Sequence, residues 1–198
     1  LIEERYPRAD LLRRNSGYAL DELLKQEPIA EGTGAPFELA KLLCGSEGTL
    51  GIVTEAKLNL VAAPETNLLV CAHFEELSEA LRATVEAVDY DPAAVELMDK
   101  RILDLTKEHA EHRKNRFFVE GEPGAILVIE FYGDTTAEVE QKADEVIAGL
   151  QAADYGYAYP IVHPPDDSRV WKLRKDGLGL LMGVKGDTKP VTVVEDTA

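Results

Sequence analysis

Residues 125–132 read AILVIEFY, a run of branched aliphatic and aromatic side chains interrupted only by Glu130. A short run of this kind is typical of a strand buried in a sheet. The sequence then changes its period, because Thr135 and Glu138 have the spacing of a capping box at the start of a helix. The apolar residues that follow recur at helical spacing, at Val139, Ala143, Val146, Ile147 and Leu150. The pattern predicts a strand that leads directly into an amphipathic helix.

Strand and helix signals also alternate on both sides of this unit. Further strands are predicted over residues 67–74, 93–98, 157–162 and 191–195, and further helices over residues 101–108 and 166–182. Another helix is predicted to be capped by Ser78 and to turn Leu81, Val85 and Val88 toward the core. Strands separated by helices, with the strand–helix–strand unit repeated, predict an α+β fold: a ferredoxin-like sandwich, an antiparallel sheet with helices on one face.

The first part of the chain differs from the rest in composition and in the regularity of its hydrophobic pattern. Residues 1–62 are glycine-rich and irregular, except for the stretch 52–61, where apolar side chains alternate as in a strand with one buried face. Pro64 cannot continue a central strand, so we expect a boundary here and two domains, residues 1–62 and 63–198. The chain opens without a recognisable element and closes on a strand, which indicates an internal piece of a longer protein.

Charge and composition exclude several classes of function. The chain has 21 Lys and Arg against 37 Asp and Glu, a net charge of −16, which would repel nucleic acid. No apolar run approaches the ~20 residues of a membrane span. Cys44 and Cys71 both lie in apolar sequence and are predicted to be buried free thiols, which indicates a reducing compartment such as the cytoplasm.

Residues 45–51, GSEGTLG, form a glycine-rich loop that precedes the stretch 52–61. Glycine permits positive φ and a close approach of backbone to a ligand, and free amide groups in such a loop can bind an anion. The alternative is a tight turn with no ligand. The loop is neither a P-loop, since no lysine follows its second glycine, nor a Rossmann fingerprint, since it does not follow a strand.

Three segments in the same order resemble FAD-linked flavoenzymes of the vanillyl-alcohol oxidase type. The resemblance is greatest to the branch with D-lactate dehydrogenase, glycolate oxidase and D-2-hydroxyglutarate dehydrogenase. The segments are RRNSGYALDELL at 13–24, LLCGSEGTLGIVTEAKLNLVAAPE at 42–65 and VWKLRKDGLGLL at 170–181, followed by the similar strand VTVVEDTA at 191–198. Extra residues around 31–37 and the phrase GLGLLMGVKGDTKPV at 177–191 look more like large bacterial members fused to an iron–sulfur part.

The resemblance implies an end piece of the FAD-binding domain in residues 1–62 and most of the substrate-side cap in residues 63–198. Its implied FAD contacts are Gly45, Ser46, Glu47, Gly48, Gly51, Ile52 and Val53. Glu47 has the alternative role of tying the loop's own N–H groups. Arg174 would grip a substrate carboxylate through its planar fork, or be an exposed helix residue, and Lys189 would lie near the substrate. Trp171 is predicted to pack in the core.

The resemblance also places functional groups outside this chain. The catalytic base and the ligands of a divalent metal would follow residue 198, so no catalytic residue and no metal site is expected within it. His109 and His112 are spaced i, i+3 in a highly charged stretch and are predicted to lie on a solvated face. We therefore expect the chain by itself to be inactive.

The function implied for the whole protein is FAD-dependent oxidation of a D-2-hydroxy acid, such as lactate, glycolate or 2-hydroxyglutarate, to the 2-oxo acid. The electron acceptor stays open, a homo-oligomer is compatible with the sequence, and the expected location is cytoplasmic or peripheral to the inner face of the membrane. One alternative keeps the flavin with an alcohol, phenol or sugar as substrate. The other is a ligand-sensing or subunit-docking module without flavin chemistry.

Overall fold

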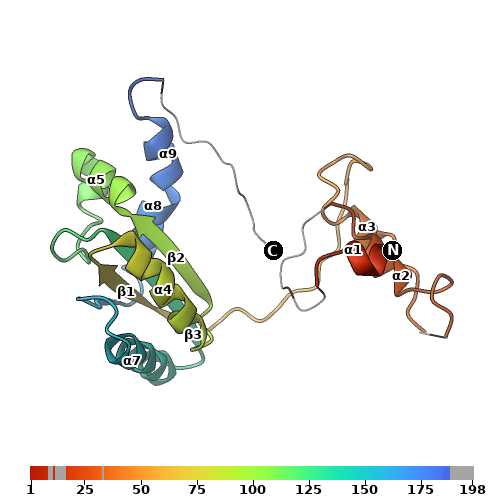
Figure 1. The fold of residues 1–198 in the computed structure, drawn as a ribbon, viewed down its shortest axis with the longest axis horizontal. Helices are drawn as coiled ribbons and strands as arrows, with labels where there is room; N and C mark the ends of the chain where they lie inside the picture. Colours follow the sequence, from red (N-terminus) through yellow and green to blue (C-terminus); the bar gives the residue numbers. More distant parts are fainter. Residues whose placement is uncertain (9–10, 12–16, 33, 188–198) are drawn as a thin grey trace. The chain divides into compact units, whose positions relative to one another are not determined.

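A computed structural model describes residues 1–8, 11, 17–32 and 34–187. Contacts between residues divide the chain into an N-terminal unit, Leu1–Leu60, and a second unit that begins at Val61 (Figure 1). The predicted strand over 191–195 lies outside the described residues.

The N-terminal unit contains only short helices: α1 (Ile2–Arg5), α2 (Leu20–Leu24) and α3 (Ala40–Leu43). Tyrosine hydroxyls link distant parts of this unit. Tyr6 donates to the Tyr18 carbonyl at 2.7 Å, and the Tyr18 hydroxyl lies 2.7 Å from Oγ1 of Thr49. The buried Gln26 accepts a hydrogen bond from the Glu38 amide. Side-chain and backbone hydrogen bonds therefore contribute to the order of a unit that has little regular structure.

The predicted strand over 52–61 is wrong. The segment forms no strand, and Ile52 and Leu60 are 93% and 91% exposed. A strand needs a neighbour for its backbone hydrogen bonds, and none of the described residues pairs with this segment. The described residues therefore neither pair with this segment nor bury its alternating apolar side chains.

The second unit is built on a four-stranded sheet. Its strands are β1 (Thr66–Phe74), β2 (Ala94–Asp99), β3 (Ala125–Gly133) and β4 (Ile161–Val162). Their order is β2-β3-β1-β4, and every neighbouring pair is antiparallel. Helix α4 (Leu77–Val88) connects β1 to β2, and α7 (Thr136–Ala152) connects β3 to β4. The predicted α+β class with an antiparallel sheet is confirmed.

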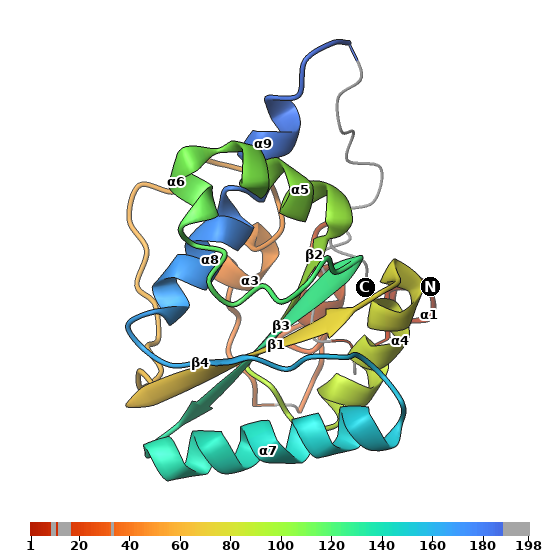
Figure 2. The same ribbon diagram turned by 90° about the vertical axis from the view of Figure 1, so that its left-hand side faces the viewer.

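Helices cover both faces of the sheet, so the prediction of helices on one face is wrong. Figure 2 shows α4 and α7 on one side, and α5 (Lys100–Glu108) and α8 (Asp167–Lys175) on the other. The strands explain this arrangement, because β1 is apolar on both faces. Its residues Leu68 and Val70 pack in the cluster under α4 and α7, whereas Leu69 and Cys71 pack in the cluster under α5 and α8. Each apolar face needs a cover.

Helix α4 reverses the predicted orientation. It begins at Leu77 with Glu76 as its N-cap residue, and Ser78 makes no cap. The buried residues are Ala80, Ala83 and Ala87, whereas the predicted core residues Leu81, Val85 and Val88 are 55%, 73% and 55% exposed. Hydrophobicity alone selected the wrong face because small side chains, not large ones, let this helix lie close to the sheet.

Most of the other predicted elements hold to within one residue at each end, whereas one predicted helix is broken and one predicted strand is shortened. Thr135 accepts a hydrogen bond from the Glu138 amide at the start of α7, while Oε2 of Glu138 accepts from the Asp134 amide. Asp99 caps α5 by accepting from the Ile102 amide at 2.9 Å. The predicted helix 166–182 breaks at Asp176 into α8 and α9 (Gly177–Met182), and the predicted strand 157–162 is reduced to β4 with one bridge before it. A single helical turn, α6 (Ala110–Arg113), follows α5.

Candidate functional site

The glycine-rich loop of the N-terminal unit is a compact turn with left-handed backbone. Gly45, Glu47 and Gly48 have φ values of 77°, 49° and 77°. Ser46 is buried, and its carbonyl accepts from both the amide and the hydroxyl of Thr49, at 2.9 and 2.7 Å. A Cβ at position 45 would lie 3.1 Å from the Gly17 carbonyl. Glycine at this position allows that close approach, and the succession of positive φ values is of the kind that turns amide groups toward a ligand.

The far end of this loop carries apolar side chains in solvent. Gly51 has open space around its α carbon, and Ile52 and Val53 are 93% and 67% exposed. Exposed branched side chains next to a left-handed turn suit a surface that a flat aromatic ligand or another part of a protein covers. The residues of the loop therefore fit a portion of an FAD site.

The two cysteines differ in their surroundings. Cys44 is exposed, so its predicted burial is wrong; the short helix α3 leaves it at the surface. Cys71 is buried in β1 as predicted, and burial raises the pKa of its thiol far above the ordinary range because the thiolate would be desolvated.

In the second unit, Trp171 anchors α8 to the sheet. Its indole Nε1 donates to Oε1 of Glu130 at 3.3 Å, and Nδ2 of Asn67 donates to the same oxygen at 3.0 Å. Asn67 also donates to Asp167 on α8 at 2.9 Å. Glu130 is only 7% exposed, and its negative charge is the main reason why the pKa of Tyr132 lies above its ordinary value. Trp171 packs against the core as predicted, and Glu130 adds an anchor that the sequence did not reveal.

Arg174 lies one helical turn beyond Trp171. Its Nη2 donates to Oε2 of Glu96 on β2 at 2.7 Å, and the two side chains are 37% and 41% exposed. The Nε atom of Arg174 is buried and has no hydrogen-bond partner in the described part of the chain. Arg174 is therefore a half-buried, paired guanidinium with one end at the surface. Glu96 was not among the predicted site residues. The sequence does carry a signal for its face, because successive side chains of a strand point to opposite faces and Glu96 stands between Val95 and Leu97.

The other predicted site residues have different outcomes. Lys189 lies outside the described residues. His109 is exposed as predicted, but the prediction for His112 is wrong: it is buried at 8% exposure, where its Nδ1 lies 3.7 Å from Oδ2 of Asp176. Among the described residues, no three or more His, Cys, Asp or Glu side chains are arranged to hold a metal ion.

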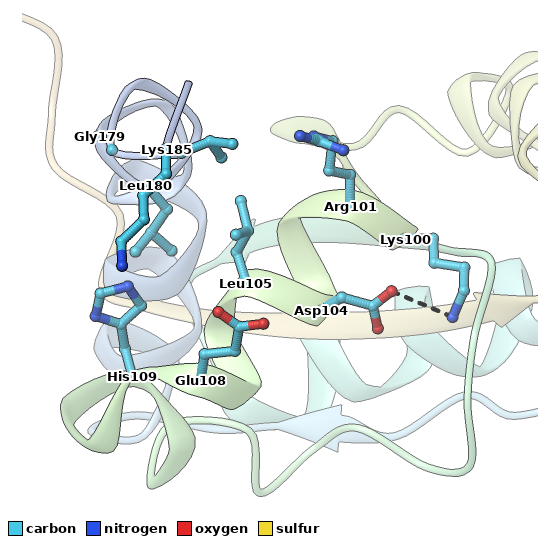
Figure 3. A pocket seen from close by; sticks show the side chains of 11 residues that line it. Lys100, Arg101, Asp104, Leu105, Glu108, His109, Gly179, Leu180 and Lys185 are labelled. Atoms are coloured by element: carbon cyan, nitrogen blue, oxygen red, sulfur yellow. Dashed lines mark ion pairs between the residues drawn. The ribbon is translucent and has the colours of Figure 1, made fainter. Parts of the chain in front are cut away.

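A cavity of about 950 Å³ is lined on one side by α5 (Figure 3). Its other side is formed by α9 and the residues that follow α9, up to Lys185. Leu105, Leu180 and Val184 form its apolar part, and Lys100, Arg101 and Lys185 contribute positive charge. Asp104 balances part of this charge through Lys100 at 3.4 Å. The cavity depends on the packing of α9 against α5, where a Cβ at Gly177 would lie 3.3 Å from Ile102. Local sequence patterns carry no signal of such packing.

In the ranges that the structure describes, no helix combines the length and apolar composition that crossing a membrane requires.

Comparisons with known proteins relate both units to dehydrogenases. The D-2-hydroxyglutarate dehydrogenase of Pseudomonas putida is 33% identical over 205 residues, and that of Pantoea ananatis is 29% identical over 208 residues. Each alignment covers 100% of this chain and 20% of the relative. A probable mitochondrial D-lactate dehydrogenase of Danio rerio is 30% identical over 159 residues, 79% of this chain and 30% of the relative. The chain thus spans about a fifth of the length of the D-2-hydroxyglutarate dehydrogenases that it matches.

A solved structure of alkyldihydroxyacetonephosphate synthase has a similar fold, with a TM-score of 0.51, 20% sequence identity and coverage of 74% of this chain and 29% of that one. The family described as "FAD linked oxidases, C-terminal domain" matches residues 63–198, which is most of the chain. The chain therefore belongs to the FAD-linked oxidases.

Proposed function

We propose that this chain is part of an FAD-dependent oxidoreductase that oxidises a D-2-hydroxy acid to the 2-oxo acid. The observation that carries the proposal is the alignment with D-2-hydroxyglutarate dehydrogenases, which runs through both units and so includes both the glycine-rich loop and Arg174. Residues 1–62 are then the C-terminal part of the FAD-binding domain. Residues 63–198 are the substrate-side cap, of ferredoxin-like topology.

In this proposal the glycine-rich loop holds the cofactor. Gly45, Glu47 and Gly48 direct backbone amides toward it, and Ile52 and Val53 supply the apolar surface that is exposed in the structure. Bound FAD supplies the chemistry by accepting two electrons from the carbinol carbon of the substrate. The residues of this chain bind and orient, and the base that takes the hydroxyl proton belongs to another part of the protein, so the chain by itself is inactive.

Arg174 binds the carboxylate of the substrate in this proposal. A planar guanidinium suits a carboxylate better than an ammonium does, because it donates two parallel hydrogen bonds. Trp171, Glu130 and Asn67 hold α8 on the sheet and thereby fix the helix from which Arg174 extends. Lys189 is a second, weaker candidate for the substrate site. A divalent metal, an iron–sulfur cluster, the electron acceptor and a homo-oligomeric assembly belong to the whole protein, whose proposed location is cytoplasmic.

The first test is the visible spectrum of the full-length protein, with the 198-residue chain beside it. We expect flavin bands that bleach when D-2-hydroxyglutarate, D-lactate or glycolate is added, and no turnover by the isolated chain. A full-length protein that is colourless and takes up no added FAD would contradict the proposal.

A second test addresses Arg174. Arg174→Ala should raise KM for the acid by about tenfold to a hundredfold, the range expected when a charge-assisted hydrogen bond is lost. Lys175→Ala is the matched control, because it removes a positive charge from the next position of α8, where the side chain is exposed. Equal KM values for the two variants would mean that Arg174 does not bind the substrate.

One observation favours a docking role as the second candidate. Leu77, Leu81, Val85 and Val88 form an exposed stripe along α4, at 41% to 73% exposure. An apolar stripe of this kind is typical of a surface that contacts protein. A flavin-free full-length protein would make docking the leading interpretation.

A further inference from the structure

The end of the Arg174 side chain is already occupied in this chain. A guanidinium binds a carboxylate with two parallel bonds along an edge, either Nε with Nη2 or Nη1 with Nη2. The Nε atom is buried, so only the Nη1–Nη2 end can meet a ligand from solvent. Oε2 of Glu96 lies 2.7 Å from Nη2, which belongs to that end. A substrate carboxylate that binds along the Nη1–Nη2 end therefore shares Nη2 with Glu96.

The surroundings of this pair add to the negative charge. Glu96 lies on β2 on the same face as Met98, which packs in the cluster under α8. Ala94, two residues earlier, is paired with Glu130 of β3, so both carboxylates lie on neighbouring strands beneath α8. Arg174 is thus neutralised by Glu96 while a second, buried carboxylate lies on the adjacent strand. An arriving anion meets a guanidinium whose charge is already balanced.

We propose that Glu96 is a positioning residue that acts as the resident counter-ion of Arg174, and that a substrate carboxylate must displace it in order to bind. The inference rests on the proposed function only in taking Arg174 as a carboxylate site. Glu96 holds the guanidinium in place while no ligand is present, and the strength of this ion pair limits the affinity for the acid. Removing the charge of Glu96 should therefore tighten binding, whereas removal of a merely structural residue would weaken it or leave it unchanged.

The test measures carboxylate binding by the 198-residue chain directly. D-2-Hydroxyglutarate is titrated into ¹⁵N-labelled chain, and the shift of the Arg174 Nε–Hε signal is followed; Arg174→Lys identifies this signal by its loss. Glu96→Gln preserves the size and a hydrogen-bond acceptor and removes only the charge. We expect the dissociation constant to fall about three- to fivefold, the range that a half-exposed ion pair is worth.

Glu86→Gln is the matched control. It makes the same change in net charge on α4, which covers the opposite face of the sheet. Unchanged or weaker binding by Glu96→Gln, equal tightening by Glu86→Gln, or no saturable shift in any of the chains would each overturn the inference. Glu96→Asp carries the test if Glu96→Gln does not fold, because the shorter side chain should also lose the 2.7 Å contact and tighten binding.

The full-length protein separates failure of this inference from failure of the proposed function. There, Glu96→Gln should lower KM for D-2-hydroxyglutarate about three- to fivefold and leave kcat within about twofold. A flavin that bleaches with the acid while KM is unchanged would refute the role of Glu96 and leave the proposed function intact. A flavin-free protein would refute the proposed function, and the titration of the isolated chain would then decide the role of Glu96.

Discussion

Gly124 lies where the chain enters β3, and it offers the sharpest structural prediction. Its amide donates to the Phe74 carbonyl at 2.8 Å, at the point where the end of β1 meets the start of β3. A Cβ at this position would lie 2.0 Å from the carbonyl oxygen of Glu75 and 2.8 Å from its carbonyl carbon. These are backbone atoms, so no rotation of a side chain relieves the contact. Gly124→Ala must therefore push the chain segments apart.

The cost follows from what moves with the backbone. Ordinary contact begins near 3.4 Å, so the displacement exceeds what thermal adjustment of a packed core absorbs. Phe74 is fully buried in the cluster under α4 and α7, and the Gly124–Phe74 hydrogen bond fixes its position. Overpacking strain together with one weakened backbone bond amounts to about 3 kcal/mol. For a unit of this size, that corresponds to a fall of roughly 10 °C in Tm.

Urea unfolding followed by tryptophan fluorescence measures this cost, because Trp171 is the only tryptophan and lies in the second unit. Gly179→Ala is the matched control: its Cβ has nothing within 4 Å and it lies in α9, so we expect a change within about 1 kcal/mol. If Gly124→Ala unfolds at the same urea concentration as the parent chain, the close approach of the Glu75 carbonyl is wrong.

Two further predictions concern titratable groups. An aromatic disulfide reagent should modify Cys44 rapidly and Cys71 only after unfolding, because Cys71 is buried and its pKa is strongly raised; two rapidly reacting thiols in the folded chain would contradict the structure. His73 is buried, with Nδ1 2.7 Å from the Cys71 carbonyl and Nε2 accepting from the Glu120 amide, and burial lowers its pKa. The unfolded chain therefore takes up this proton at a higher pH than the folded chain does. The free energy of unfolding should fall as the pH is lowered through about 6.5, the ordinary pKa of histidine, and His73→Asn should flatten this dependence. An unchanged slope in this variant would show that other groups cause it.

Local periodicity predicted the elements whose burial depends on their own sequence. β3 and α7 agree with the prediction because each buries its most apolar side chains. In β3 these belong to the stretch AILVIEFY, and in α7 they are Val139, Ala143, Val146 and Leu150. The same logic failed for α4, which buries Ala83 and exposes Val85. Close packing of the helix on the sheet, rather than hydrophobicity, selects that face, and the required separation is a tertiary property that a single sequence does not reveal.

The site divides in the same way. The Trp-x-x-Arg segment could be found because Trp171 and Arg174 are neighbours on one helix. Their partners could not, since Glu130 and Glu96 lie 41 and 78 residues away in sequence. Only the register of β2 on β3 and the placement of α8 across the sheet bring them together. The resemblance selected Arg174 as a candidate binding residue, whereas the tertiary structure shows which residues hold it in place.

The two carboxylates beneath α8 perform different tasks, and their exposure decides which. Glu130 is 7% exposed and accepts hydrogen bonds from neutral donors, so breaking them would leave buried groups unpaired at a substantial cost. Glu96 is 41% exposed and its bond to Arg174 faces solvent, where an ion pair is worth about 1 kcal/mol or less. The bonds of Glu130 therefore keep α8 in place while the weaker bond of Glu96 can be exchanged. Arg174 can therefore exchange Glu96 for another carboxylate while α8 keeps its position on the sheet.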